Sequence, residues 1–360
     1  MKKIIILAAV AATLAACNND MEMATDSREA DVICMSAGIE ATATTTTRAA
    51  SLPTGSSQIA VVACYTDPAL YPTPNDAATK WDAPYVDHQK ADVISVSSKT
   101  YNFSWTEDNK QYWPEQGEEI QLIAYSPIAM DGSCVTTPRG SKIDVSLPDR
   151  PEDMPDVIVA NKTPKRGDVT GRKTYGKDAN GKPIKIQNPE KVQFDFTHVL
   201  SRLSVYLNAQ GGNPANPTIV SRIQVIIDKS AQKKTLDMAD KTWTAGEAAA
   251  NDIVYTYDND GKGWTLSAQS KNASKTLLFP DTQSSVKVRI FINDTEGVLS
   301  EVQLDDILPG NFDKLHFSKG NTTGLYVTIK ENKEVSLRGS VTAWENTGDY
   351  SVSIHPDDLK

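Results

Sequence analysis

The chain has 360 residues and an acidic balance, with 46 Asp and Glu residues against 37 Lys and Arg residues and a formal net charge of −9. This length is sufficient for two domains of ordinary size, and the negative charge argues against nucleic acid as a partner. Besides Cys17 there are three cysteines, Cys34, Cys64 and Cys134. An odd number argues against a disulfide framework, although the spacing leaves a Cys64–Cys134 pair open.

The first residues have the pattern of a bacterial lipoprotein signal. Lys2 and Lys3 precede an apolar stretch that ends in Leu14-Ala15-Ala16-Cys17. This stretch is too short and too rich in alanine for a stable membrane span. We therefore predict that residues 1–16 are a signal peptide and that Cys17 is lipidated, which would tether the mature protein outside the cytoplasm. An ordinary secretory signal that happens to meet a cysteine is the alternative.

Strands dominate the predicted secondary structure. Segments of about four to eight residues with alternating apolar side chains recur between Gly, Pro, Asn and Asp. The stretch 198–207 fits either a helix or a strand. Turn signals at short intervals favour an all-β fold built from β-sandwiches. The clearest predicted strands are 58–65, 119–125, 143–147, 157–160, 192–196, 286–292, 325–329 and 335–337.

A threonine-rich stretch near the N-terminus has the composition of an exposed linker. Residues 41–51 read ATATTTTRAAS, and Arg48 is the one side chain in them larger than Thr. Upstream, residues 30–41 have the length and apolar spacing of one sandwich strand. We place this first strand at Val32, Cys34, Ser36 and Gly38.

A second unusual stretch, residues 161–191, contains nine Lys or Arg residues against three acidic ones, together with four Gly. Such a composition is typical of a long solvated loop or an interdomain connection. We therefore place the boundary between an N-terminal domain, residues 49–191, and a C-terminal domain, residues 192–360.

The sequence offers no motif of an enzyme or of a metal site. His88, His198, His316 and His355 are far apart, and none lies at metal-ligand spacing from another. Nucleophile elbows and phosphate-binding glycine loops are missing as well. We therefore predict no catalytic residue, no cofactor and no metal. The tripeptide 166–168, Arg-Gly-Asp, matches an adhesive motif, although so short a match in a basic loop is usually accidental.

Aromatic residues gather in the first half of the chain and allow two interpretations. Core and hairpin packing is one, because Trp and Tyr are favoured on pleated surfaces. A platform for sugars is the other. The residues concerned are Trp81, Trp105, Trp113, Tyr85, Tyr101 and Tyr112.

Several short motifs, in order along most of the chain, resemble those of the fimbrillin-like proteins, the fimbrial subunits of Gram-negative anaerobes. An aromatic, a histidine and a Leu-Ser-Arg-Leu run in residues 194–203 are similar to the opening of the family's second domain. The other matching motifs are Tyr112-Trp113-Pro114, residues 123–127 (IAYSP), residues 156–160 (DVIVA), Leu308-Pro309-Gly310 and residues 341–344 (VTAW).

This resemblance implies two transthyretin-like β-sandwich domains in tandem, in a subunit of a type V pilus that is exported to the outer membrane as a lipoprotein. It also implies that a trypsin-like protease cuts after an arginine in the N-terminal linker, so that the first strand leaves and a strand of a neighbouring subunit replaces it. In this chain the cut would follow Arg48, with Ala49 as the new N-terminus and residues 17–48 as the removable leader. The implied partners are other pilus subunits, the outer membrane, and a host protein or glycan as ligand.

Several alternatives remain open from the sequence. Arg48 fits a plain solvated charge, and a cut at Arg28 would leave the first strand attached. The short tail, residues 345–360, suggests a subunit that accepts a donor strand without supplying one, as at a pilus tip. Finally, a glycan-binding surface lipoprotein would use the aromatic cluster of the first half.

Overall fold

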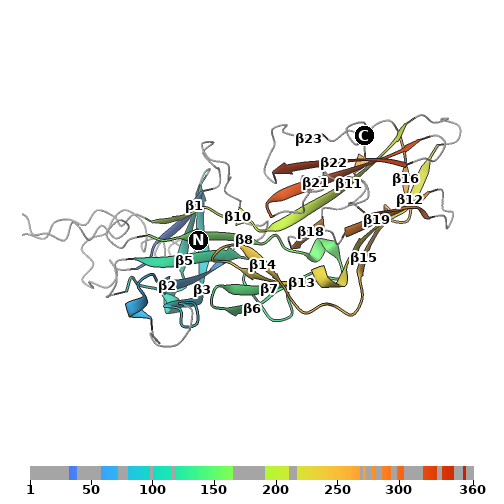
Figure 1. Ribbon diagram of the computed structural model, residues 1–360. Helices are drawn as coiled ribbons and strands as arrows, with labels where there is room; N and C mark the ends of the chain where they lie inside the picture. Colours follow the sequence, from blue (N-terminus) through green and yellow to red (C-terminus); the bar gives the residue numbers. More distant parts are fainter. Residues whose placement is uncertain are drawn as a thin grey trace, which may run out of the picture. The chain divides into compact units, whose positions relative to one another are not determined.

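The computed structural model describes residues 32–38, 58–71, 80–97, 100–114, 119–164, 191–210, 217–267, 271–272, 277–280, 286–292, 298–303, 319–330, 335–343 and 352–353 (Figure 1). Across these ranges the regular structure consists of β-strands and four short 3-10 turns, with no α-helix. The predicted all-β class is therefore confirmed. The 3-10 turns are η3 (Pro68–Leu70), η4 (Glu107–Asn109), η5 (Pro151–Asp153) and η7 (Lys229–Ala231).

Contacts divide the chain into two compact units, and each unit consists of several separate segments of the sequence. The first comprises residues 1–128, 138–142 and 158–197, and the second comprises residues 129–137, 143–157 and 198–360. Segments of the first half thus group with the C-terminal unit. The boundary predicted at residue 191, as a border between separate domains, stays a prediction.

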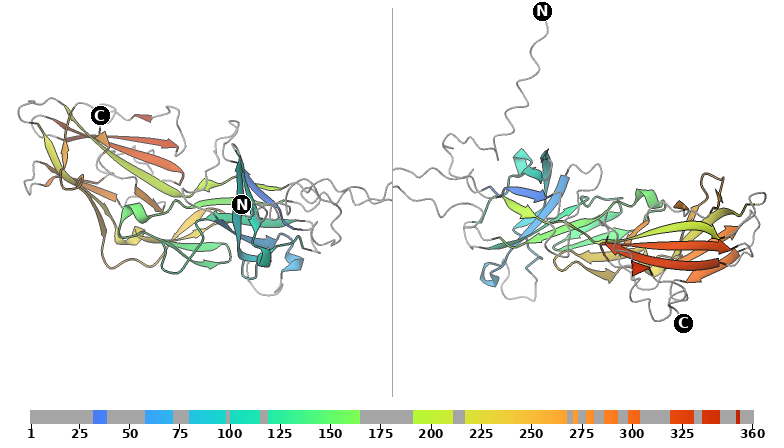
Figure 2. Two further views of the ribbon diagram at one scale, coloured as in Figure 1. Left: turned by 180° about the vertical axis from the view of Figure 1, so that it is seen from behind. Right: turned by 90° about the horizontal axis from the view of Figure 1, so that it is seen from above.

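One eight-stranded sheet organises the first unit, in the order β10-β8-β5-β2-β3-β4-β1-β9. Its outermost strands, β9 and β10, are separated along the chain only by Asp195 and Phe196, so the two edges of the sheet must approach each other. Figure 2 shows the resulting curvature. The strands are β1 (Met35–Gly38), β2 (Gln58–Tyr65), β3 (Val86–Ser97), β4 (Thr100–Trp105), β5 (Ile120–Ser126), β8 (Ile158–Lys162), β9 (Val192–Phe194) and β10 (Thr197–His198).

The hydrophobic core of the first unit is formed by apolar side chains on the inner face of this sheet. Phe103, Phe194 and Phe196 are each no more than 1% exposed, and they belong to one buried cluster with residues of β1, β2 and β5. Burial of this apolar surface is the main force that stabilises the curved sheet. Lys162 at the end of β8 pairs with Asp195, which lies in the link between β9 and β10, with Nζ 2.6 Å from Oδ2.

The second unit has a core of its own, formed between strands of two sheets. One sheet has the order β17-β11-β21-β22-β23, with β18 also paired to β11, and the other has the order β15-β12-β19-β20, with β16 paired to β12. Leu203, Val225 and Val327 lie in a buried cluster that shares no residue with the first. These strands are β11 (Leu200–Gln210), β12 (Ile219–Ile227), β15 (Ile253–Tyr257), β16 (Trp264–Thr265), β17 (Lys271–Asn272), β18 (Leu277–Pro280), β19 (Val286–Ile292), β20 (Val298–Gln303), β21 (Asn321–Lys330), β22 (Val335–Ala343) and β23 (Val352–Ser353).

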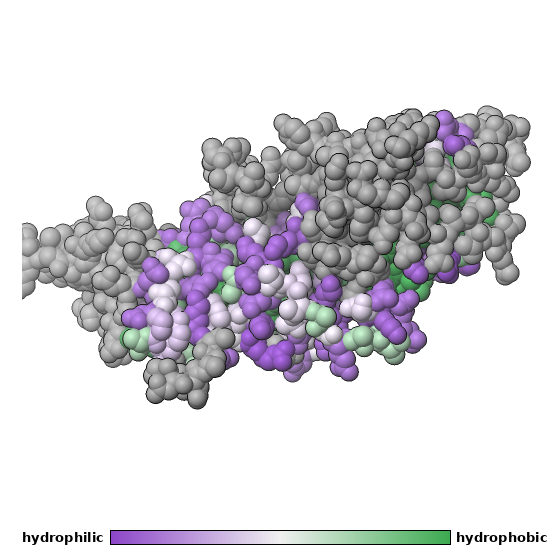
Figure 3. Space-filling view, in the orientation of Figure 1, coloured by the Kyte–Doolittle hydropathy of each residue, from purple (hydrophilic) through white to green (hydrophobic). Residues whose placement is uncertain are grey.

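A further sheet has the order β14-β13-β7-β6. It consists of β6 (Val135–Arg139), β7 (Lys142–Ser146), β13 (Lys233–Asp237) and β14 (Thr242–Ala245). Its strands are four or five residues long, and Ile143, Val145 and Leu236 on them are fully buried. On the face shown in Figure 3 the coloured surface is mostly hydrophilic, with small hydrophobic patches.

The clearest predicted strands are present, most of them with ends within two residues of the prediction, whereas β21 begins four residues earlier and β22 extends six residues further than predicted. The ambiguous stretch at 198–207 forms the strand β11, in which Leu203, Val205 and Leu207 point to the core at every second position. The predicted strand at 192–196 ends at Phe194, because the chain turns at Asp195 to reach β10. The basic stretch begins later than predicted, since Asn161 and Lys162 belong to β8. Within the described residues no helix is long and apolar enough to cross a membrane.

Candidate functional site

The N-terminal strand β1 lies inside the sheet of the first unit, between two other strands. It pairs antiparallel with β4, where Met35 lies opposite Phe103 and Ala37 opposite Tyr101. On its other edge it pairs in parallel with β9, where Met35 lies opposite Val192. Both edges of β1 therefore have hydrogen-bonding partners, and β1 connects β9 to the rest of the sheet.

Three further hydrogen bonds hold the residues just before β1. The Ile33 amide donates to the Gln111 carbonyl at 2.9 Å, and the Val192 amide donates to the Cys34 carbonyl at 2.9 Å. The buried Trp105 Nε1 donates to the Ile33 carbonyl at 2.8 Å. Val32 adds a bridge to Tyr112. All but the indole bond involve backbone atoms alone, so a strand of different sequence could accept or donate them equally well.

The inner face of this segment fills the core of the first unit. Ile33, Met35 and Ala37 are 1%, 0% and 1% exposed and belong to its buried cluster. The first strand predicted from the sequence is named by the residues of the other alternation, Val32, Cys34, Ser36 and Gly38. The structure places those four residues in β1 or directly before it. The side chains that point to the core are those of Ile33, Met35 and Ala37.

The outer face of β1 is covered as well. Cys34 and Ser36 are each 8% exposed. Lys191, the residue before β9, donates from Nζ to Asn102 Oδ1 on β4 at 2.8 Å. Asn102 lies directly opposite Ser36, and β1 lies between β4 and β9. The Lys191 side chain therefore crosses the outer face of β1 from one neighbouring strand to the other.

The aromatic cluster of the first half belongs to the interior. Trp81, Trp105 and Trp113 are 8%, 4% and 3% exposed. Tyr85 is half-buried and donates from its hydroxyl to the Tyr112 carbonyl at 2.9 Å. Buried indole rings offer no face on which a sugar could stack. The glycan platform expected as the alternative is therefore absent at these three tryptophans, which serve the core.

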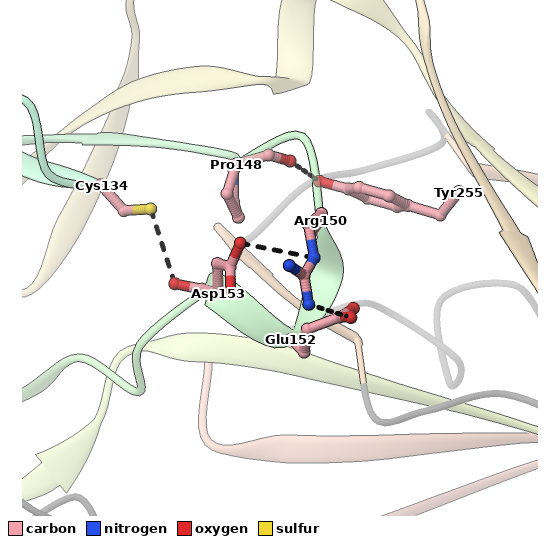
Figure 4. A network of polar contacts seen from close by, with 6 residues as sticks. All are labelled: Cys134, Pro148, Arg150, Glu152, Asp153 and Tyr255. Atoms are coloured by element: carbon pink, nitrogen blue, oxygen red, sulfur yellow. Dashed lines mark hydrogen bonds and ion pairs between the residues drawn. The ribbon is translucent and has the colours of Figure 1, made fainter.

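The cysteines form no disulfide: Cys34, Cys64 and Cys134 are all unbridged. The open Cys64–Cys134 pair is thus not formed. Burial raises the pKa of the Cys64 thiol to about 12. Cys134 lies beside the η5 turn, where its thiol approaches the Asp153 carbonyl at 3.8 Å (Figure 4). Free thiols with raised pKa values are poor nucleophiles.

The η5 turn is held by a small polar network (Figure 4). Arg150 forms ion pairs with Glu152 at 2.9 Å and with Asp153 at 3.7 Å, and the Tyr255 hydroxyl donates to the Pro148 carbonyl at 2.6 Å. Arg150 is 68% exposed, so its ion pairs are screened by solvent. The network fixes the turn and brings together no nucleophile and base.

The two described histidines have structural surroundings. His198 Nδ1 lies 2.7 Å from Asp156 Oδ2 in a largely buried pair. His88 Nδ1 lies 3.0 Å from the Tyr125 hydroxyl. Neither histidine lies in a group of three or more metal-binding side chains, and the described residues contain no such group.

Several predicted site residues lie outside the described part of the chain. These are Cys17, Arg28, Arg48, Ala49, the tripeptide 166–168, His316 and His355. Of the C-terminal tail the structure describes β23, in which Val352 lies opposite Val341 and Ser353 opposite Ser340 of β22. This part of the tail therefore adds a strand to a sheet of its own unit.

These features define a class of all-β protein in which an N-terminal strand fills an inner position of a curved sheet. The sequence model of the fimbrillin-like family matches residues 47–344, and the chain belongs to that family. The match begins after β1.

Solved structures agree on the fold. A candidate cell adhesion protein from Bacteroides uniformis is 16% identical, with a TM-score of 0.53, and the alignment covers 88% of this chain and 99% of that one. A candidate cell adhesion protein from Bacteroides ovatus is 14% identical, with a TM-score of 0.52, and the alignment covers 88% of this chain and 99% of that one. A search of curated proteins finds no match.

Proposed function

We propose that this protein is a structural subunit or tip adhesin of a cell-surface pilus, and that it assembles when proteolysis removes β1 and a strand of another subunit takes its place. The observation that carries this proposal is the position of β1 between β4 and β9. Only the linker with Arg48 connects β1 to the rest of the unit in sequence. Its work would be structural rather than enzymatic.

A cut after Arg48 would change how β1 is held. In the intact chain the linker keeps β1 at a high local concentration next to its position in the sheet. After the cut, residues 17–48 would be a separate peptide held by non-covalent contacts alone. Its departure would expose the ladder edges of β4 and β9 together with the apolar walls that Phe103 and Phe194 form. Such an edge is open to strand addition from a partner.

The remaining parts of the proposal follow from the sequence and the family. Lipidation of Cys17 would anchor the precursor in the outer membrane, and cleavage would release it to the fimbrium. The two units would correspond to two tandem transthyretin-like sandwiches. The pairing of β23 with β22 supports a subunit that keeps its tail, and therefore accepts a donor strand without supplying one.

The experiment is limited digestion of the purified mature chain with a trypsin-like protease. We expect a new N-terminus at Ala49, loss of the leader fragment on gel filtration and binding of an added donor peptide. Arg48→Ala should block all three changes, whereas the matched control Arg28→Ala should block none. A well-folded monomer that has been cut at Arg48 and accepts no donor peptide would refute the proposal.

A further inference from the structure

The core-facing side chains of β1 and of the residues just before it occupy spaces of different size. Ala37 lies opposite Tyr101 on β4 and opposite Phe194 on β9, so two aromatic residues flank one methyl group. Tyr101 stacks on Phe103 with ring centroids 6.4 Å apart, and Phe194 contacts Phe196 at 6.0 Å. Neighbouring rings thus support both walls, and Ala37 is 1% exposed between them. A larger side chain at this position would have to displace an aromatic ring.

The other inner positions accept long side chains. Met35, with Phe103 and Val192 opposite, is fully buried, and Ile33 is 1% exposed beside the indole of Trp105. Methionine and other unbranched side chains adapt to the shape of such a space. The inner side chains of this segment are therefore large at Ile33 and Met35 and small at Ala37.

The outer face is limited by the Lys191–Asn102 hydrogen bond. This bond spans the width of β1 on the side of Ser36, and Asn102 is itself oriented by donating to Ser95 Oγ at 2.9 Å. Cys34 and Ser36, which β1 places on this side, are both small and 8% exposed. A long or charged residue at position 36 would have to break the bond between Lys191 and Asn102.

We propose that the position between β4 and β9 selects its occupant by side-chain size on both faces. The inference rests on the proposed strand exchange. The accepted strand has large apolar residues at the positions of Ile33 and Met35, and small residues at the positions of Cys34, Ser36 and Ala37. Backbone hydrogen bonds supply sequence-independent affinity, and these five positions supply specificity.

This pattern of side-chain sizes indicates that the accepted strand comes from a different subunit and is not the C-terminal tail of a second copy of this chain. The tail reads Tyr350-Ser351-Val352-Ser353-Ile354. When Ser351 and Ser353 take the outer positions of Cys34 and Ser36, the tail places Ile354, or Tyr350 in the reverse direction, between Tyr101 and Phe194. That position holds only the methyl group of Ala37.

The test uses full-length protein cut at Arg48 in the presence of fluorescent peptides, with incorporation measured by gel filtration. The reference peptide has the sequence of residues 30–41. We expect a Met35→Leu peptide to be incorporated as well as the reference, because it conserves volume. Ala37→Leu and Ser36→Lys peptides should need about tenfold higher concentration, and a peptide of residues 348–356 should not be incorporated.

A compensating variant of the protein makes the test specific. Tyr101→Ala should widen the position and restore incorporation of the Ala37→Leu peptide, without restoring the Ser36→Lys peptide. Equal incorporation of all peptides, or incorporation of the tail peptide at the reference level, would overturn size selection while leaving strand exchange intact. If no peptide is incorporated, the reference included, strand exchange itself fails and this inference fails with it.

Discussion

His88 carries backbone strain and a burial cost at one position of β3. Its φ of 45° lies in the left-handed region that side chains other than Gly rarely adopt, where the pairing of β3 with β2 shifts register. Its side chain is 11% exposed and contacts the Tyr125 hydroxyl. Desolvation by burial lowers the His88 pKa, although Asp87 and the Gly140 backbone partly oppose the shift.

This lowered pKa predicts that acid weakens the protein near neutrality. Because the folded state resists protonation of His88, the unfolded state binds more protons once the pH falls below the ordinary histidine pKa of about 6.5. The free energy of unfolding should therefore decrease between pH 7.5 and pH 5. His88→Asn, which tolerates the positive φ, should reduce this decrease in urea titrations at the two pH values.

The matched control for His88 is Val96→Thr, at a position on the same strand that is 61% exposed. It should have the pH profile of the unmodified protein, because it changes no titrating group. If His88→Asn and Val96→Thr lose stability equally on acidification, His88 does not contribute to the pH dependence.

At the scale of the element, β1 determines whether β9 belongs to the sheet. Among the described strands β9 pairs with β1 alone, whereas β4 also pairs with β3. A strand without a partner exposes its amides to solvent. Removing β1 should therefore affect β9 most and the centre of the sheet least.

Hydrogen exchange measures this difference directly. After cleavage at Arg48 and removal of the leader, the amides of β9 should lose protection, because their ladder is gone. Amides in the pair of β2 and β5 should keep theirs, because that ladder does not involve β1. The uncut Arg48→Ala protein is the control. Unchanged protection of β9 after loss of the leader would show that β1 does not hold it.

At the scale of the whole molecule, the described residues form two buried clusters with no shared member. Leu122 of β5 belongs to the first and Leu203 of β11 to the second, and both are fully buried. Each cluster lies within one compact unit. A cavity in either cluster should therefore weaken its own unit first.

This separation predicts different consequences for two equivalent truncations. Leu122→Ala and Leu203→Ala should each cost about 2–5 kcal/mol of unfolding free energy, from lost burial and the cavity left behind. Only Leu122→Ala should also reduce peptide incorporation after cleavage, because its cluster contains Met35 and Ala37. An equal reduction by Leu203→Ala would show that the second core supports the strand position as well.

Much of the fold was predictable because alternation with a period of two is a local property. Strands such as β2, β5, β19 and β21 were found because their apolar residues recur at every second position and turn residues bound them. Other strands were missed. In β3, Asp, His, Gln and Lys interrupt the alternation, and a register shift near Val93 breaks its period.

By itself the sequence determined the all-β class, the positions of most strands and the candidate first strand with its linker. Tertiary structure decided which strands β1 lies between, and that Ile33, Met35 and Ala37 point inward. The physical reason is that an alternating pattern of side chains looks the same whichever set of positions faces the core. Because both faces of β1 are buried, the polarity of its residues does not distinguish the two sets. Strand partners distant in sequence, such as Met35 and Val192, are chosen by the packing of the whole core, which no local pattern encodes.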